Sequence, residues 1–204
     1  MHPVGSVAFL NEAWSALQRT PTPPQRHAIS LTRQTESHKL RIDSGARMEI
    51  AFPSVEFFRA LQTVMQSDRE RFKRLGYFDT TFGIRVLDDA GIRREFVLGF
   101  EVFDCTQVRA SDDLAAESVD FILEGGRETW VEMLRNIQQH GAADAAHSIN
   151  TLTHLGERMR VVYDDPDGHD KLYRFAESVQ EFINLAAQLD IEFPAGRVAA
   201  HAST

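Results

Sequence analysis

The stretch that decides the fold is VDFILEGGRETWVEML, residues 119–134. Its first six residues are rich in branched and aromatic side chains, which predicts a β-strand that ends at Gly125-Gly126. Its second part, which continues to Gln139, places Trp130 and Leu134 on one face at helical spacing. A strand that passes through two glycines into an amphipathic helix indicates a sheet with a helix packed on it.

The sequence before this stretch predicts three more strands. Residues 80–87 alternate between apolar and polar side chains, and a turn follows at Asp88 to Gly91. Phe96 to Phe100 alternates in the same way, and Cys105 to Val108 continues a third strand. Residues 159–163 predict a fifth strand after the helical region. Short alternating runs joined by tight turns are typical of an antiparallel meander.

Helical spacing of apolar residues appears in the remaining segments. Ser54 can cap a helix that carries the apolar residues of 57–65, and a short second helix extends to Leu75. Further helices are expected over 144–155 and over 169–189. We therefore predict an α+β fold: a five-stranded sheet with helices packed on one face, enclosing a hydrophobic cavity.

Composition excludes several classes of protein. The chain has 204 residues, with 22 Lys and Arg against 30 Asp and Glu, a net charge of −8 that argues against nucleic acid as a partner. No apolar run is long enough for a transmembrane segment, and the first residues lack the basic start of a secretory signal. The single cysteine, Cys105, predicts a reducing, cytoplasmic environment.

Charge and phenylalanine content divide the chain near residue 50. Residues 1–50 have a net charge of +2 and contain a Pro-rich linker after a short apolar helix, whereas the rest carries −10. Thirteen of the fourteen phenylalanines lie between Phe52 and Phe193, with Phe9 outside. We expect an N-terminal extension over 1–50, one domain over 51–192 and a flexible tail over 193–204.

No motif for catalysis or metal binding stands out. His140, His147 and His154 are spaced by seven residues, roughly 10 Å along a helix, which is too far for one shared ion. Cys105 lies in an expected strand after an acidic residue, which is typical of an inert thiol. Asp120 and Glu101 are the carboxylates in or near strands that could perform acid–base chemistry if they faced a cavity.

The remaining signal is an excess of aromatic side chains that carry no polar group. Phenylalanine outnumbers tyrosine and tryptophan together by fourteen to five. Plain core packing explains any single phenylalanine. The alternative interpretation is that the apolar residues of several helices and one sheet face line a cavity for an apolar ligand.

The order of elements and several motifs resemble the sterol carrier protein type two family. The matching stretches are the helix Phe57–Met65, residues 81–84, 96–101 and 119–125, and the helix with Glu128 to Leu134. The similarity covers about residues 53–190. It departs from the family at Val102-Phe103-Asp104, where the family usually has an Asp-Gly type turn, which leaves Phe103 at a turn tip.

The resemblance implies binding or transfer of an apolar ligand such as a sterol, fatty acid or acyl-CoA, with no catalytic residues, no cofactor and no metal. The residues expected to line the ligand cavity are Phe57, Leu61, Phe82, Phe100, Phe121, Trp130, Leu134, Ile149, Leu152, Phe175 and Phe182.

Two other hypotheses stay open at this stage. The chain could be an enzyme or accessory subunit that holds a hydrophobic substrate for isomerisation, hydrolysis or a partner's chemistry, with Asp120 and Glu101 as the residues to test. It could also form a homo-oligomer or bind a partner through residues 1–50 or Phe103.

Overall fold

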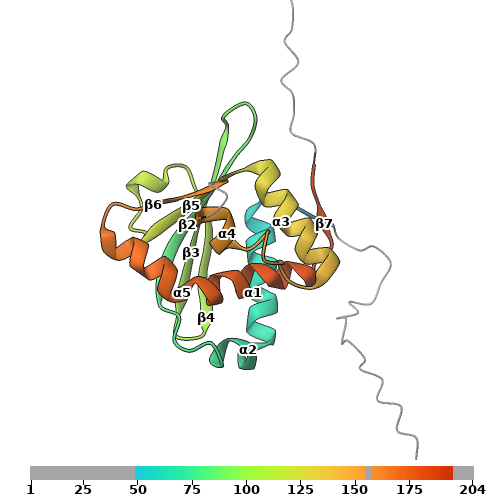
Figure 1. Cartoon of the computed structure of the whole chain (residues 1–204), viewed down its shortest axis with the longest axis vertical. Helices are drawn as coiled ribbons and strands as arrows, with labels where there is room; N and C mark the ends of the chain where they lie inside the picture. Colours follow the sequence, from blue (N-terminus) through green and yellow to red (C-terminus); the bar gives the residue numbers. More distant parts are fainter. Residues whose placement is uncertain (1–48, 155–157, 195–204) are drawn as a thin grey trace, which may run out of the picture. The chain divides into compact units, whose positions relative to one another are not determined.

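A computed structural model describes residues 49–154 and 158–194 of the chain. Its main sheet has five strands in the order β4-β3-β2-β5-β6 (Figure 1). Strand β2 pairs antiparallel with β3 on one side and parallel with β5 on the other. The strands are β2 Thr80–Leu87, β3 Arg93–Glu101, β4 Asp104–Ser111, β5 Phe121–Gly126 and β6 Met159–Val162. The predicted five-stranded sheet is confirmed.

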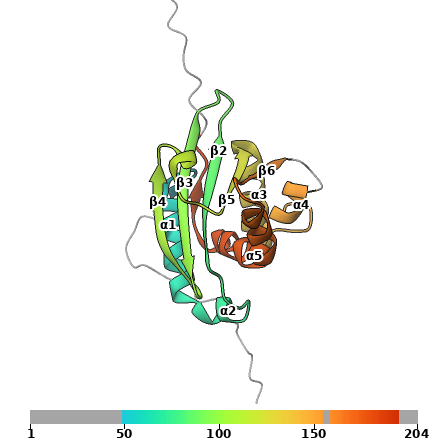
Figure 2. The same cartoon turned by 90° about the vertical axis from the view of Figure 1, so that its left-hand side faces the viewer.

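Five α-helices accompany this sheet in the described residues: α1 Val55–Ser67, α2 Arg69–Lys73, α3 Arg127–His140, α4 Ile149–His154 and α5 Pro166–Asn184. Helix α1 lies beside β4, α5 beside β5, and α4 beside β6, as Figures 1 and 2 show. The chain therefore has the α+β arrangement that the sequence predicts.

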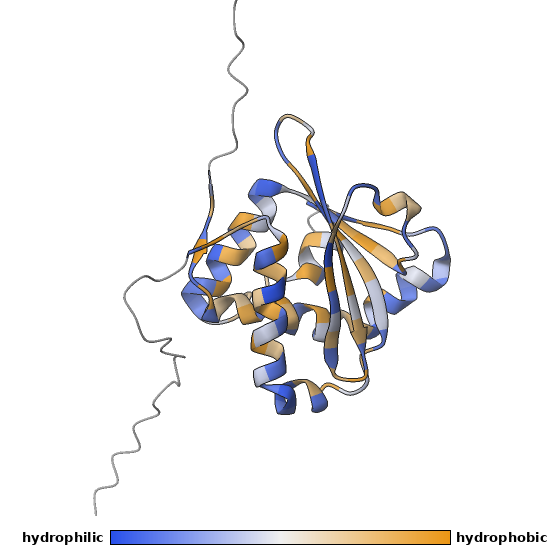
Figure 3. Cartoon of the chain, turned by 180° about the vertical axis from the view of Figure 1, so that it is seen from behind, coloured by the Kyte–Doolittle hydropathy of each residue, from blue (hydrophilic) through white to orange (hydrophobic). Residues whose placement is uncertain are grey.

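Alternation along the strands decides which face the helices cover. Phe82, Ile84 and Val86 of β2 all belong to the main apolar core, and Phe82 is directly opposite Leu98 of β3 and Phe121 of β5. Because side chains alternate between the two faces, these residues form one continuous apolar surface across three strands. Figure 3 shows the hydrophobic positions along the strands and helices. Burial of that surface against α1, α3 and α5 is the main driving force of the fold.

The opposite face of the sheet has a smaller apolar cluster. It consists of Val97, Leu114 and Ile122, with Leu114 supplied by the 3-10 helix η1, Leu114–Ala116. Gly83 lies beneath Leu114: a Cβ atom at this position would be 2.9 Å from Leu114 Cδ1. A larger residue here would require the Leu114 side chain to shift, so the glycine allows η1 to pack closely on the sheet.

The last long helix begins earlier than the sequence indicates. The prediction started it at His169, after a turn that contains Pro166 and Gly168, but α5 begins at Pro166. Asp165 caps it by accepting a hydrogen bond from the Asp167 amide, and proline fits the first turn because its missing N–H is not needed there. The helix ends at Asn184, and a 3-10 turn, η2 Leu185–Gln188, follows.

Two other boundaries were predicted incorrectly. Residues 144–148, expected to be helical, form turns, because the Asp144 side chain accepts hydrogen bonds from the Ala146 and His147 amides. Helix α4 therefore begins only at Ile149. The fourth strand was expected over 119–124, but β5 begins at Phe121, so Asp120 lies before the strand.

The ends of the described domain meet in a two-stranded parallel sheet. Strand β1, Ile50–Ala51, pairs with β7, Ile191–Glu192. Phe193, which the sequence assigned to the tail, packs on Phe52 with ring centroids 6.4 Å apart. The expectations for residues 1–48 and 195–204, including the apolar helix with Phe9, lie outside the described residues.

Candidate apolar ligand site

The eleven residues expected to line a ligand site come together in one cluster. Ten of them are buried, and Phe175 is partly buried and packs against the others. They come from β2, β3, β5 and from helices α1, α3, α4 and α5. The structure therefore gathers the set between the helices and the covered face of the sheet, as one apolar core.

Phenylalanine rings dominate the part of this core next to the sheet. Phe82 stacks on its register partner Phe121 at 5.1 Å, and on Phe100, which lies diagonally across on β3, at 5.5 Å. Phe182 of α5 meets Phe100 edge-on at 5.0 Å. Phe78 lies 4.3 Å from the Phe100 ring and completes this group. Stacked and edge-on contacts are the favoured geometries for such rings.

A second aromatic group lies near the start of α1. Phe58 contacts Phe57 at 5.0 Å and Phe96 at 4.8 Å, and Phe52 contacts Phe57 at 5.1 Å. Phe52, Phe58, Phe78 and Phe96 were not among the expected lining residues. The sequence held a signal for Phe58, whose neighbour Phe57 was selected, and for Phe96, which shares the alternation of Phe100.

Trp130 is the one side chain with a polar atom in the expected set. Its indole Nε1 is buried and has no hydrogen-bond partner among the described residues. It lies against Gly125 of β5, where a Cβ atom would be 3.0 Å from Nε1. An unpaired buried N–H is unfavourable, so this atom is a donor available to an acceptor group in the interior.

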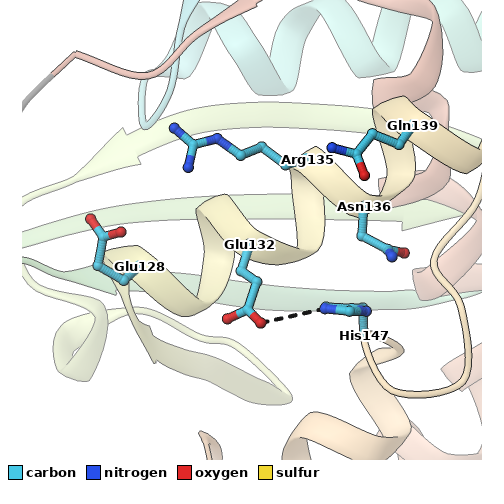
Figure 4. Close-up of a pocket in the computed structure, with 6 residues that line it drawn as sticks. All are labelled: Glu128, Glu132, Arg135, Asn136, Gln139 and His147. Carbon is cyan, nitrogen blue, oxygen red and sulfur yellow. Dashed lines mark ion pairs between the residues drawn. The ribbon is translucent and has the colours of Figure 1, made fainter.

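Two hollows in the described part of the chain lie outside the set of eleven expected residues. One, of about 360 Å³, lies on the outer side of α3 and has only polar lining residues, among them Glu132, Arg135 and His147 (Figure 4). The other, of about 290 Å³, lies between the start of α1 and the ends of β3 and β4. Neither includes any of the eleven residues. A ligand among those residues would therefore have to separate side chains that contact one another in this structure.

The carboxylates considered for acid–base chemistry differ in their surroundings. Asp120 accepts hydrogen bonds from Lys171 Nζ at 2.6 Å, Thr80 Oγ1 at 2.7 Å and the Thr81 amide at 3.0 Å. Burial alone would raise its pKa, but these donors outweigh burial and lower the pKa of Asp120. Its environment thus stabilises the charged form and joins α5 to the sheet. Glu101 is exposed at the end of β3.

Cys105 is buried in the core. Burial raises the pKa of its thiol to about 12, because a thiolate would lose its hydration there. Such a thiol is a poor nucleophile and a poor metal ligand at neutral pH.

Within residues 49–154 and 158–194, no group of three or more His, Cys, Asp or Glu side chains is placed to hold a metal ion. In the same ranges, no helix combines the length and apolar character needed to cross a bilayer.

Comparisons with known proteins define the fold. No family model and no curated protein matches the sequence. A solved structure of a conserved hypothetical protein from Thermus thermophilus, provisionally described as a sterol carrier protein, matches 75% of this chain and 97% of its own, with a TM-score of 0.52 and 15% identity. A crystal structure of a sterol carrier protein 2 matches 66% of this chain and 95% of its own, with a TM-score of 0.49 and 14% identity. The apo form of sterol carrier protein 2 from Yarrowia lipolytica matches 64% of this chain and 89% of its own, with a TM-score of 0.40 and 11% identity. This chain has a sterol carrier protein 2-like fold.

Proposed function

We propose that this protein binds an apolar ligand of the sterol, fatty acid or acyl-CoA type between its helices and its sheet, without catalysing a reaction. The observation that carries the proposal is the aromatic core itself. Ten of the eleven expected lining residues are buried in one cluster, and that cluster includes an unpaired donor, Trp130 Nε1. Transfer of the ligand between membranes, and a cytoplasmic location, belong to the same proposal.

Energetics support an amphiphilic ligand with a long alkyl part. Transfer of each CH₂ group from water into an apolar interior contributes about 0.8 kcal/mol. An alkyl chain of roughly twelve such groups gains about 10 kcal/mol gross, from which association and ordering take several kcal/mol. The remaining gain of about 6 kcal/mol corresponds to a dissociation constant of tens of micromolar. A carboxyl, hydroxyl or ester oxygen on the ligand would also satisfy the indole N–H of Trp130.

Entry of the ligand requires opening of the core, because the expected lining residues contact one another. Phe182 of α5 meets Phe100 of the sheet at 5.0 Å, so an alkyl chain between them would have to part the helix from the sheet. We expect binding to be slower than diffusion-limited association, and to be accompanied by a change in near-ultraviolet circular dichroism from the displaced aromatic rings.

The test is titration of the full chain with a fluorescent fatty acid, displacement by unlabelled lipid, and native mass spectrometry of the protein as purified. Saturable one-to-one binding that unlabelled fatty acid displaces is the expected result. A Phe100→Ala variant should alter the affinity, whereas Ile92→Ser, at an exposed position in the β2–β3 turn, should leave it unchanged. Absence of both a bound lipid and a saturable signal would overturn the proposal.

A further inference from the structure

An apolar patch lies at the turn between β3 and β4 and the loop that precedes β2. It consists of Tyr77 and Val102, which are exposed, and Phe103, which is half-buried, and is called here the turn patch. The side chains of Tyr77 and Val102 are 74% and 49% exposed, although both are large and apolar or aromatic. The rings of Tyr77 and Phe103 are stacked with centroids 5.1 Å apart. The Phe78 amide donates a hydrogen bond of 2.8 Å to the Val102 carbonyl, which fixes the turn beside the loop that carries Tyr77.

The backbone of this turn is unfavourable for its own residues. Glu101 and Asp104 are paired, so only Val102 and Phe103 form the connection. Val102 has φ of +63° and is the only non-glycine residue with positive φ among those that the structure describes. Two-residue hairpin turns favour Asn and Gly at such positions, and a β-branched residue is disfavoured there. The chain thus keeps two apolar side chains at a tip where polar residues would be more stable, which is typical of a functional surface.

The area of the turn patch favours a lipid surface over a protein as its partner. A stable protein–protein interface buries about 800 Å² on each side, or some 20–30 residues. Three side chains at a hairpin tip fall far short of that area. Partial insertion into the interfacial layer of a bilayer needs only a few apolar and aromatic side chains, and tyrosine is enriched at that depth.

Charge around the turn patch is compatible with a neutral lipid surface. Segments 69–79 and 101–104 contain four basic and four acidic residues, although the chain as a whole carries −8. Arg69 pairs with Asp104, and Lys73 with Glu70, so part of this charge is already neutralised within the protein. This end of the molecule therefore meets a zwitterionic surface without the repulsion that its other acidic regions would experience near anionic lipid.

We propose that the turn patch docks the protein on a zwitterionic lipid surface, with Tyr77, Val102 and Phe103 in the interfacial layer. The proposal concerns a surface site and does not depend on ligand binding in the core. It is tested by co-sedimentation of the full chain with phosphatidylcholine vesicles. We expect measurable binding of the native chain, and roughly tenfold weaker partitioning of Phe103→Ser and Tyr77→Ser, because each removes one inserted ring.

The Val102→Asn variant distinguishes an effect on vesicle binding from an effect on stability. Asparagine tolerates positive φ, so this variant should raise the melting temperature by about 2 °C while it weakens vesicle binding severalfold. The matched control is Ile92→Ser. Ile92 is 58% exposed in the β2–β3 hairpin, which Figure 1 shows at the other end of the sheet, and its replacement should leave binding unchanged.

Four outcomes of the vesicle experiments would overturn the proposal. These are no binding of the native chain to phosphatidylcholine vesicles, unchanged binding of the turn-patch variants, equal loss in Ile92→Ser, and binding that requires phosphatidylserine. Light scattering after size-exclusion chromatography tests the alternative that the turn patch binds a second copy of the chain. A dimer that Val102→Asn or Phe103→Ser converts to monomer would assign the turn patch to a second copy of the chain and would likewise refute lipid docking.

Discussion

Arg85 and Glu95 are direct cross-strand partners on β2 and β3, and Arg85 Nε lies 2.5 Å from Glu95 Oε1. Arg85 Nη1 also donates a hydrogen bond of 2.9 Å to Glu124 on β5, whose register partner on β6 is Arg160. Four alternating charges thus cross four strands on the face opposite the helices. Burial alone would lower the pKa of Arg85, but its hydrogen bonds to Glu124 and Glu95 outweigh that effect and raise it.

Replacement of Arg85 should be strongly destabilising. Arg85→Met leaves the carboxylate of Glu95, 6% exposed, without its cation, and loss of one partner of a buried pair costs about 3–5 kcal/mol. The free energy of unfolding from urea titration measures the effect. Arg160→Met is the control, because Arg160 is exposed and its ion pair contributes at most about 1 kcal/mol. Equal effects of the two substitutions would contradict this account of the four alternating charges.

Gly168 is required where α5 crosses the start of β5. A Cβ atom at Gly168 would lie 1.9 Å from the backbone carbonyl oxygen of Asp120, so Gly168→Ala forces the helix away from the strand. We expect a loss of about 3 kcal/mol or more in the free energy of unfolding. At Gly126 a Cβ atom would meet nothing within 4 Å, so Gly126→Ala should cost less than about 1 kcal/mol. Similar melting temperatures for both variants would refute the close approach.

Asp120 should make stability depend on pH in the acid range. Its pKa in the folded protein is lowered from an ordinary value of 3.8, so the fold favours the charged form. The stabilisation is therefore complete at neutral pH and is lost as pH falls below about 4 and the carboxylate is protonated. Asp120→Asn should be less stable than the native chain at pH 6, and the difference should shrink below pH 4. A difference that is constant from pH 6 to pH 3 would contradict this.

Cys105 should be unreactive in the folded protein. Its thiol is buried and its pKa is raised to about 12, so almost no thiolate exists at pH 8. Reaction with a thiol-specific disulfide reagent should proceed only as fast as the protein unfolds, and should release one equivalent in urea because the chain has one cysteine. Rapid modification of the native chain would show that the thiol is accessible and would reopen a chemical role for it.

Hydrophobic periodicity predicted the strands and most of the helices. Alternation placed Phe82, Phe100 and Phe121 on one face, and helical spacing placed Leu134 and Phe182 opposite them, because burial decides both patterns. The boundaries that failed depend on polar contacts of capping side chains. Pro166 was assigned to a turn, although the cap at Asp165 and the first-turn position of the proline make it part of α5.

The packing of η1 on the face of the sheet opposite the main apolar core could not be predicted from the sequence. Leu114 is a single apolar residue in an acidic loop, and its packing over Gly83 arises only when β2, β3 and β5 are in register. The role of Asp120 was equally hidden, because its partners Thr80 and Lys171 are 40 and 51 residues away. That the two hollows lie apart from the expected lining could not be predicted either, since the pattern for a packed core and for a cavity wall is the same.

The short parallel pair β1–β7 has a mechanical consequence. The Ile50 amide donates to the Asp190 carbonyl at 2.8 Å, and the Phe52 amide donates to the Glu192 carbonyl at 2.9 Å. Because the two strands run in the same direction, tension applied at residues 49 and 194 pulls them past each other along their length. Both hydrogen bonds then bear the load together, so the domain resists stretching through its ends more than an unzipping geometry would.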